Sequence, residues 1–153
     1  MRISAKADYA VRAAAELAAA APGGRPVKGE QLASAQGIPQ KFLENILADL
    51  RTAGLVLSRR GAEGGYALTR PADEISVAEV MRAVEGPLAA VQGVRPESLH
   101  YAGAAARLPE VWVALRANLR AVLERVTLAA LASGTLPASV TELAAAADAW
   151  QPH

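Results

Sequence analysis

The segment Ser58-Arg59-Arg60-Gly61-Ala62-Glu63-Gly64-Gly65-Tyr66-Ala67-Leu68 has the pattern of a β-hairpin. Short apolar runs at residues 55–57 and 66–68 flank three glycines. Because glycine adopts positive φ without steric cost, this spacing predicts two strands joined by a loop of about five residues. Two arginines bring positive charge to the loop. By itself the pattern also fits an ordinary solvated hairpin, so its meaning depends on the residues around it.

The residues before the hairpin predict three helices. The first is capped by Ser4 and runs to about residue 21, and the second covers residues 28–36. The third runs from about Pro39 to Ala53, with Gly54 at its C-terminal end. Gly37 lies in the short turn between the second and third helices, which is the spacing of a helix-turn-helix motif.

The third predicted helix is amphipathic. Its expected core stripe consists of Phe42, Leu43, Ile46, Leu47 and Leu50. The opposite face carries Gln40, Lys41 and Glu44 near the N-terminal end, the part of a recognition helix that contacts base edges. The alternative is an ordinary solvated face on which Lys41 and Glu44 form an ion pair.

The order of these elements predicts a winged helix-turn-helix, and with it nucleic acid binding. The charge distribution agrees with this interpretation. Residues 1–70 hold ten Lys/Arg and six Asp/Glu, a net charge of +4, whereas residues 71–153 hold six and nine, a net charge of −3. An anionic partner would therefore bind the N-terminal half.

A second group of elements follows the hairpin. Ser76 and Glu79 form a capping box that starts a helix to about Val84, and residues 86–107 are irregular. Pro109 then starts a helix to about Ser133, roughly 37 Å long, which the small winged domain is too small to cover. Its apolar stripe predicts pairing with a second copy of the chain through Val111, Trp112, Leu115, Leu119, Val122, Leu123 and Val126.

The predicted fold class is mostly α: a winged helix-turn-helix with a small two-stranded β wing, plus a long C-terminal dimerisation helix. We expect a DNA-binding domain at residues 1–85, an irregular sensor-like loop at 86–107, the dimerisation helix at 108–134 and a short helix with a tail at 135–153. Ser139 is the expected cap of that short helix, which would end near Trp150.

Several function classes are excluded or disfavoured by composition. The 153 residues include no cysteine, which rules out disulfides, thiolate metal sites and a cysteine nucleophile. Charged residues interrupt the alanine-rich N-terminal segment, so we expect neither a membrane span nor a secretory signal. We therefore expect a cytoplasmic protein. There are only two histidines and no nucleophile–base pattern, so we do not expect an enzyme.

Several blocks of the sequence together resemble the Rrf2-type winged helix-turn-helix transcription regulators, a bacterial family. They cover residues 1 to about 133 and comprise Met1-Arg2-Ile3-Ser4, Tyr9-Ala10-Val11-Arg12, Phe42-Leu43-Glu44, Ala53-Gly54-Leu55-Val56, Arg60-Gly61, Gly64-Gly65-Tyr66, Glu74-Ile75, Val84-Glu85-Gly86-Pro87, Trp112 and Thr127-Leu128-Ala129. The resemblance implies a homodimer that binds a dyad-symmetric operator in double-stranded DNA.

The resemblance also implies roles for individual residues. Arg60 would enter the minor groove, and Glu44 would contact a base. The remaining implied DNA contacts are Arg2, Tyr9 and Lys28 at phosphates, Gln40 and Lys41 on the third helix, and Arg59, Gly61 and Gly64 in the wing.

One departure from the family concerns its cofactor. Many relatives carry three cysteines after Glu-Gly-Pro and bind an iron–sulfur cluster there, whereas this chain has Leu88-Ala89-Ala90-Val91-Gln92-Gly93-Val94 at that place. We therefore expect no cofactor, read Asp8 as an acid at a helix N-terminus, and read His100 as an ordinary polar side chain.

Two functional alternatives remain. The first is a cluster-free DNA-binding repressor, and the second is a winged helix that binds another protein and has no specific operator. The equivalent loop senses the signal in relatives. We therefore hypothesise that residues 86–107, with the start of the long helix near Trp112, form a pocket for a small-molecule effector of unknown identity.

Overall fold

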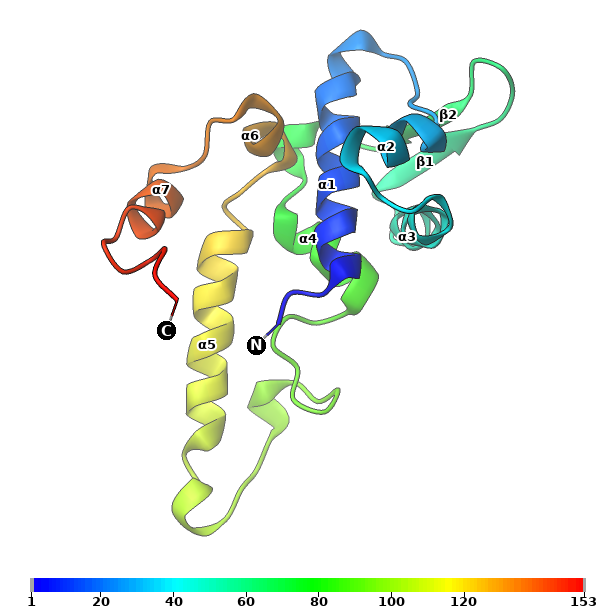
Figure 1. Cartoon of the computed structure of the whole chain (residues 1–153). Coiled ribbons are helices and arrows are strands. Elements are labelled where there is room, and N and C mark those ends of the chain that lie inside the picture. The colour runs from blue at the N-terminus through cyan, green and yellow to red at the C-terminus, as the bar shows by residue number, and fades with distance from the viewer. Residues whose placement is uncertain (1, 153) are drawn as a thin grey trace.

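The computed structural model describes residues 2–152 (Figure 1). Five helices and a two-stranded sheet form the N-terminal body and its connection to the C-terminal region: α1 (Ala5–Ala20), α2 (Gly29–Gln36), α3 (Gln40–Thr52), β1 (Val56–Arg59), β2 (Gly65–Leu68), α4 (Val77–Glu85) and α5 (Leu108–Leu123). Two short helices, α6 (Leu128–Ser133) and α7 (Ala138–Ala144), follow α5. Single 3-10 turns occur at Ala21–Gly23, Ala72–Glu74, Pro96–Ser98 and Gly103–Ala105. The mostly helical fold class predicted from the sequence is confirmed.

Helix α1 is the centre of the core. Ser4 caps it as predicted, because the Ser4 hydroxyl accepts a hydrogen bond of 3.0 Å from the backbone N–H of Ala7. Its buried face is small and consists of Ala7, Ala10, Ala13, Ala14, Leu17 and Ala18. Small side chains allow close approach, and α1 makes its most extensive contacts with α4 and α6.

The two helices of the helix-turn-helix begin and end within two residues of the predicted positions. Gly37 ends α2 with φ of 62°, a conformation that favours glycine, and the next residue, Ile38, is buried. Helix α3 begins immediately after Pro39, and its side chains Leu43, Ile46 and Leu47 are buried against the core. The tight turn therefore fixes which face of α3 points outward.

The wing is an antiparallel hairpin, and a third segment joins it. In β1 and β2, Ser58 lies opposite Tyr66 and Arg59 opposite Gly65, which leaves the predicted loop of five residues at 60–64. Val27 also pairs with Tyr66 through two backbone hydrogen bonds of 2.7 and 2.8 Å. The segment before α2 is thereby attached to the wing.

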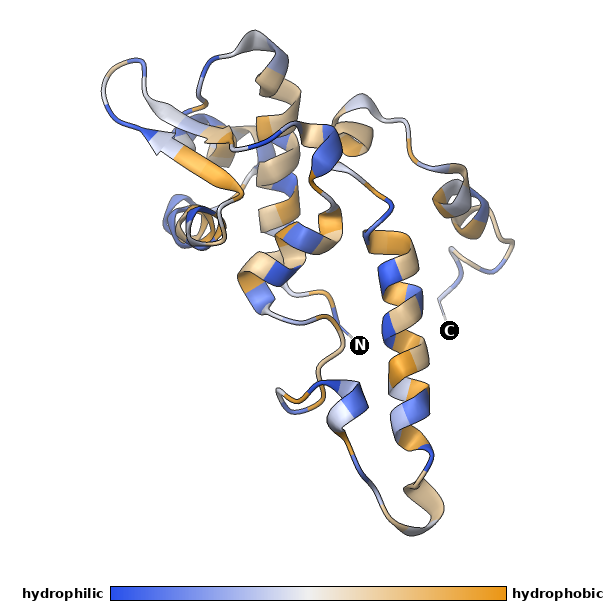
Figure 2. Ribbon diagram, turned by 180° about the vertical axis from the view of Figure 1, so that it is seen from behind, coloured by the Kyte–Doolittle hydropathy of each residue, from blue (hydrophilic) through white to orange (hydrophobic). Residues whose placement is uncertain are grey.

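Helix α5 stands apart from the rest of the molecule (Figure 1). None of its residues is buried, and Val111 is 55% exposed. Its main neighbour is the turn at Pro96–Ser98. Viewed from behind, the α5 ribbon alternates between hydrophobic and hydrophilic positions along its length (Figure 2). Among the described residues, no helix has the combination of length and apolar character needed to span a membrane.

The prediction of one continuous helix from Pro109 to Ser133 is wrong. Helix α5 ends at Leu123, and Thr127 caps a new helix, α6, by accepting a hydrogen bond from Ala130. Residues at this break pair with residues 75–77 before and at the start of α4, since Val77 donates to the carbonyl of Val126 and Leu128 donates to that of Ile75, both at 2.9 Å. These contacts between distant parts of the chain interrupt the helix.

Two further predictions need correction. Ser139 does not cap the last helix, because α7 begins at Ala138 directly after Pro137, and it ends at Ala144 rather than near Trp150. Phe42 is not part of the core stripe of α3 but is 43% exposed. The helical period of apolar residues places Phe42 on the same stripe as Leu43 and Ile46, but the buried core does not extend as far as Phe42.

Candidate nucleic-acid interface

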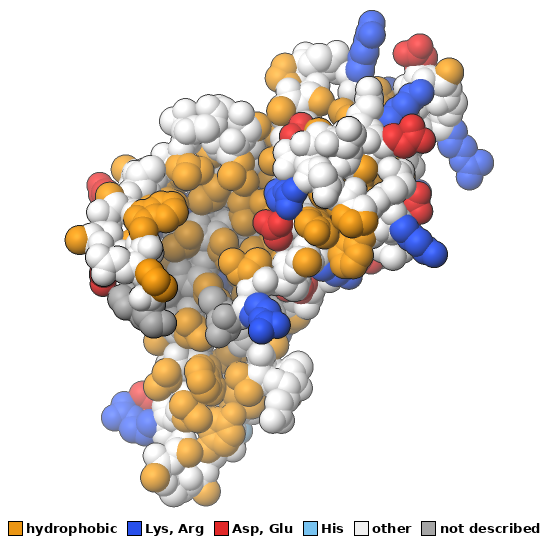
Figure 3. Space-filling view, in the orientation of Figure 1, with side chains coloured by type: hydrophobic (Ala, Val, Ile, Leu, Met, Phe, Trp, Pro, Cys, Tyr) orange, Lys and Arg blue, Asp and Glu red, His pale blue; other side chains and the backbone are white. Residues whose placement is uncertain are grey.

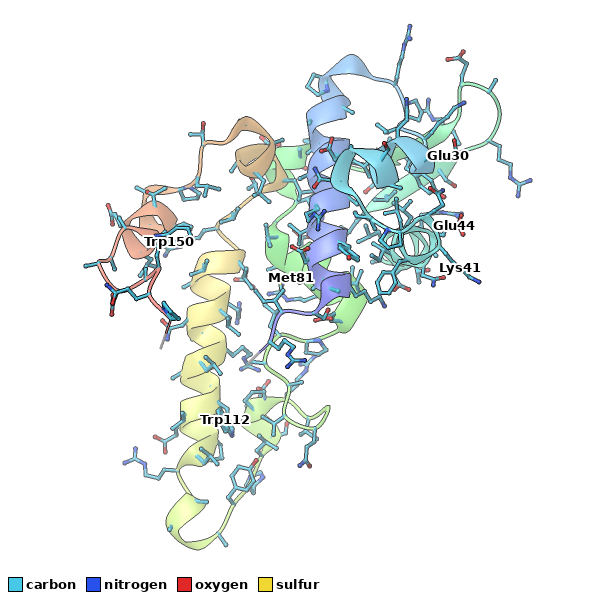
Figure 4. The ribbon with its side chains drawn as sticks, in the orientation of Figure 1. Glu30, Lys41, Glu44, Met81, Trp112 and Trp150 are labelled. Carbon is cyan, nitrogen blue, oxygen red and sulfur yellow. The ribbon has the colours of Figure 1, made fainter. Side chains whose placement is uncertain are left out.

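The outward side of α3 carries the polar residues that the sequence predicted there. Gln40, Lys41 and Glu44 are all exposed, and Figure 4 shows Lys41 and Glu44 projecting on the side away from α1. The alternative ion pair between Lys41 and Glu44 is not formed in the described structure. Both charges are therefore available to a partner.

An aromatic pair connects this face to α1. The rings of Tyr9 and Phe42 meet edge to face, with centroids 5.6 Å apart, and the guanidinium of Arg12 lies 5.2 Å from the centroid of the Tyr9 ring. Arg12 also pairs with Asp8 at 2.9 Å, so Asp8, in the first turn of α1, has a partner in its own helix. This packing restricts the position of Tyr9 beside α3.

The wing geometry depends on two glycines. A Cβ added to Gly64 would lie 2.2 Å from the carbonyl oxygen of Arg59, and one added to Gly65, which has φ of +144°, would lie 2.5 Å from that of Val27. Only glycine allows these close backbone approaches. The loop that carries Arg60 is thus constrained at its base while Arg59 and Arg60 are exposed.

A groove of about 250 Å³ lies between the start of α2, α3 and β2. Its polar lining includes Lys28, Glu30, Gln40 and Glu44. The lining residues that were not predicted as site residues are Gly29, Glu30, Leu43, Leu47 and Tyr66. Tyr66 reaches the groove because Val27 pairs with β2, and a local sequence pattern does not reveal that long-range pairing.

Several cations around α3 and the wing have no ion pair among the described residues, although Lys6 pairs with Asp49 of α3 at 2.7 Å. Within residues 2–152, the arginines and lysines in ion pairs are Lys6, Arg12, Arg70, Arg82, Arg107, Arg116 and Arg120. Lys28, Lys41, Arg59 and Arg60 are absent from that set, and Figure 3 shows Lys and Arg side chains projecting around the wing region at the upper right. We call the exposed residues Lys28, Gln40, Lys41, Glu44, Arg59 and Arg60 the winged face.

The structure does not bring every predicted DNA contact onto the winged face. Arg2 precedes α1 and lines a separate cavity of about 360 Å³ with Glu85 and Leu119. Tyr9 is close to α3 but half-buried, and Gly61 and Gly64 serve the geometry of the wing.

The predicted dimerisation residues divide into three groups. Val111, Leu115 and Val122 lie on one side of α5, and we call them the outer stripe. Leu119 and Leu123 line the cavity beside Arg2, and Trp112 has a buried indole nitrogen, so these three residues turn toward their own chain. Val126 is outside α5 and only 7% exposed, so within this chain it presents little surface to a second copy.

A family model described as "Rrf2: Iron-dependent Transcriptional regulator" matches residues 3–134. Rv1287 of Mycobacterium tuberculosis, whose name assigns it to the HTH-type transcriptional regulators, is 55% identical over 144 residues, which cover 94% of this chain and 89% of the relative. The HTH-type transcriptional regulator CymR of Bacillus subtilis is 36% identical over 135 residues, covering 88% and 92% of the two chains.

The residues of this chain do not fit an iron–sulfur cluster. There is no cysteine in the sequence to supply a thiolate. In the part of the chain that the structure describes, no three His, Cys, Asp or Glu side chains come together as a metal site would require. Asp8 is paired with Arg12, and the His100 ring lies 3.2 Å from the carbonyl oxygen of Ser98.

Solved structures give the same relationship. The structure of CymR, the global cysteine regulator of B. subtilis, superposes with a TM-score of 0.73 at 36% identity, covering 88% of this chain and 98% of CymR. IscR of T. potens superposes with a TM-score of 0.71 at 34% identity, covering 88% of each chain. The chain belongs to the Rrf2 family of transcriptional regulators, which are helix-turn-helix proteins and not enzymes.

Proposed function

We propose that this chain is a homodimeric repressor that binds a dyad-symmetric operator without an iron–sulfur cluster. The single observation that carries the DNA contact is the set of cations without ion pairs on the winged face. Elsewhere in the described chain, most arginines have a carboxylate partner. Cations left free on one face are suited to phosphate groups, which supply much of the affinity of proteins for DNA.

The polar end of α3 would contribute sequence recognition. In a helix-turn-helix, the N-terminal residues of the second helix contact base edges in the major groove. Gln40 can bind adenine through two hydrogen bonds, and the carboxylate of Glu44 can accept one from the amino group of cytosine. Arg60, the first residue of the wing loop, would enter the minor groove, where the negative potential attracts arginine.

The dimer is proposed from α5. Its outer stripe is apolar, with Val111 55% and Leu115 36% exposed and Val122 half-buried, and no residue of the helix is buried within the chain. A second copy that packs on the outer stripe would cover it. Two winged faces could then contact successive major grooves, which lie about 34 Å apart.

The test is operator binding by the full-length protein and an Arg60→Ala variant. We expect a gel shift and a footprint on the promoter of its own operon, with affinity that falls steeply as salt rises. Arg60→Ala should bind the operator roughly ten- to a hundredfold more weakly, or about 1–3 kcal/mol, because one groove contact is lost. Arg107→Ala is the matched control, since Arg107 is an exposed arginine at the start of α5.

The contrary outcomes are distinct. If Arg60→Ala binds as tightly as the wild type, the minor-groove assignment is wrong. If the wild type footprints no site and ignores duplex DNA at low salt, the operator proposal fails as a whole, and binding of another protein by the winged helix becomes the better explanation.

A further inference from the structure

A second concentration of positive charge lies away from the winged face. A cavity of about 470 Å³ opens between α4, residues 86–97 and α5. Four of its eight lining residues are arginines, and we call it the arginine pocket: Arg82 from α4, Arg95 from the loop, and Arg116 and Arg120 from α5. The other lining residues are Gly86, Pro87, Leu88 and Glu97.

The location of this charge is notable because it lies in the acidic half of the chain. Residues 71–153 have a net charge of −3 and only six Lys/Arg, yet four of those six meet here. Like charges at close range repel one another, so such a cluster raises the energy of the folded chain unless anions offset it.

Two glutamates already offset part of the positive charge of the four arginines. Arg82 and Arg120 both donate hydrogen bonds to Glu124, and Arg116 donates to Glu97. The hydrogen bonds from Arg120 and Arg82 hold the pKa of Glu124 below its usual 4.5. The pocket arginines are therefore already oriented to bind carboxylate oxygens, and Arg95 has no ion pair among the described residues.

Many donors of the pocket remain unused. Each guanidinium carries five N–H groups, and in the described structure these four arginines make only the three hydrogen bonds to glutamate. Guanidinium groups bind phosphate and carboxylate with paired, charge-assisted hydrogen bonds. A ligand that carries several oxyanion groups can use donors from more than one arginine at once.

We propose that the arginine pocket binds a small polyanion, a molecule with two or more phosphate or carboxylate groups. Its volume of about 470 Å³ is within the range of small-molecule sites. Such a ligand would bridge α4, which packs on α1, and α5, which has little contact with the body of the protein. Binding would therefore fix the position of α5 against the winged domain. The proposal goes beyond DNA binding and does not depend on it.

The experiment uses the full chain in the absence of DNA. Sodium pyrophosphate and sodium citrate serve as probes of the two oxyanion types, and sodium chloride at equal ionic strength is the reference. We expect at least one probe at millimolar concentration to raise the Tm of the wild type by several degrees above the chloride reference. Isothermal titration calorimetry then gives its Kd.

The variants are chosen to separate binding from folding. Arg95→Ala removes an exposed arginine without an ion pair, and Arg116→Ala removes one whose side chain is 22% exposed and paired with Glu97. Each should weaken binding of the effective probe at least tenfold. Arg107→Ala, outside the pocket and with an 85% exposed side chain, should change its Kd less than twofold. If Arg116→Ala does not fold, Arg95→Ala decides.

The outcomes distinguish the ligand type. Stabilisation by pyrophosphate alone indicates a phosphorylated ligand, and stabilisation by citrate alone indicates a polycarboxylate. The proposal is overturned if neither probe exceeds chloride, or if Arg95→Ala binds as tightly as the wild type. An equal loss in Arg107→Ala and Arg95→Ala also overturns it, because the effect would then reflect total charge.

Discussion

The winged domain and α5 differ in which side chains they leave exposed and without partners: cations in the winged domain, and apolar residues on α5. In the winged domain, leucine and isoleucine are buried, whereas the cations of the winged face have no partner in the chain. On α5, the arginines are paired with glutamates, whereas valine and leucine are exposed. Each region thus leaves unpaired the groups that its proposed partner would bind: cations for DNA in the winged domain, and apolar side chains for a second copy of the chain on α5.

The largest effect is expected in the core of the winged domain. Leu50→Ala removes a side chain that is 0% exposed, and it should lower the free energy of unfolding by about 2–5 kcal/mol. Leu143→Ala, at a leucine that is 63% exposed, is the control and should change it by less than about 0.5 kcal/mol. Denaturant unfolding measures both. Equal losses would mean that burial does not distinguish the two regions.

The next effect concerns the outer stripe of α5. Leu115→Glu places a charge in the proposed dimer interface, which should weaken dimerisation by about 3 kcal/mol, roughly a hundredfold in Kd. Ala117→Glu adds the same charge on another side of α5 and should leave the Kd nearly unchanged. Sedimentation equilibrium measures both. A wild type that stays monomeric at micromolar concentration would remove the proposed dimer.

A smaller effect is expected at the base of the wing. Gly64→Ala adds a Cβ that would lie 2.2 Å from the Arg59 carbonyl oxygen, so the wing must distort at a cost of about 1–3 kcal/mol. Operator affinity should fall with it, because Arg60 is displaced. At Gly23, where an added Cβ meets nothing within 4 Å, the same substitution is the control. A Gly64→Ala protein with unchanged Tm and operator affinity would show that the wing is not constrained there.

The smallest effect is the pH dependence of one carboxylate. Burial tends to raise the pKa of Glu79, but the backbone N–H of Ser76 and the side chain of Arg70 outweigh it, so the pKa lies below its usual 4.5. A lowered folded-state pKa stabilises the protein above about pH 4.5, and this stabilisation is lost as pH falls through the folded-state value. Because the side chain is 35% exposed, the contribution should not exceed about 1 kcal/mol.

Glu79→Gln tests this contribution, since glutamine keeps the capping hydrogen bond but has no charge. Its stability should fall less than that of the wild type between pH 6 and about pH 3. Glu74→Gln, at an exposed acid without an ion pair in the described chain, is the control. Parallel pH profiles for the wild type and Glu79→Gln would contradict the assignment.

Local signals predicted the winged domain well. Ser4, Gly37 and the Ser76–Glu79 capping box mark helix ends by their own backbone chemistry, and the structure places them at those ends. The hairpin loop followed from its glycines in the same way. The family itself could be identified from the sequence, and the family comparison confirms it.

What the sequence did not reveal depends on contacts between distant residues. The apolar period continues through Val126 and Leu128, so nothing local distinguishes a broken helix from a continuous one. The break becomes visible only when Val126 and Leu128 are seen to pair with Val77 and Ile75. The same holds for the groove, which exists because Val27 pairs with Tyr66, and for the arginine pocket, whose members come from three separate segments.

The backbone pairing at Val126 fixes the C-terminal end of α5 and leaves the rest of the helix without buried residues. One end of the helix is held beside Ile75 and Val77, while its 16 residues extend about 24 Å away with none of them buried. A rotation of about 10° at the held end would therefore carry the far end through about 4 Å. In a symmetric pair, the distance between the two α3 helices would depend on this one angle. A small rotation would then change that distance, so that it no longer matches the spacing of successive major grooves.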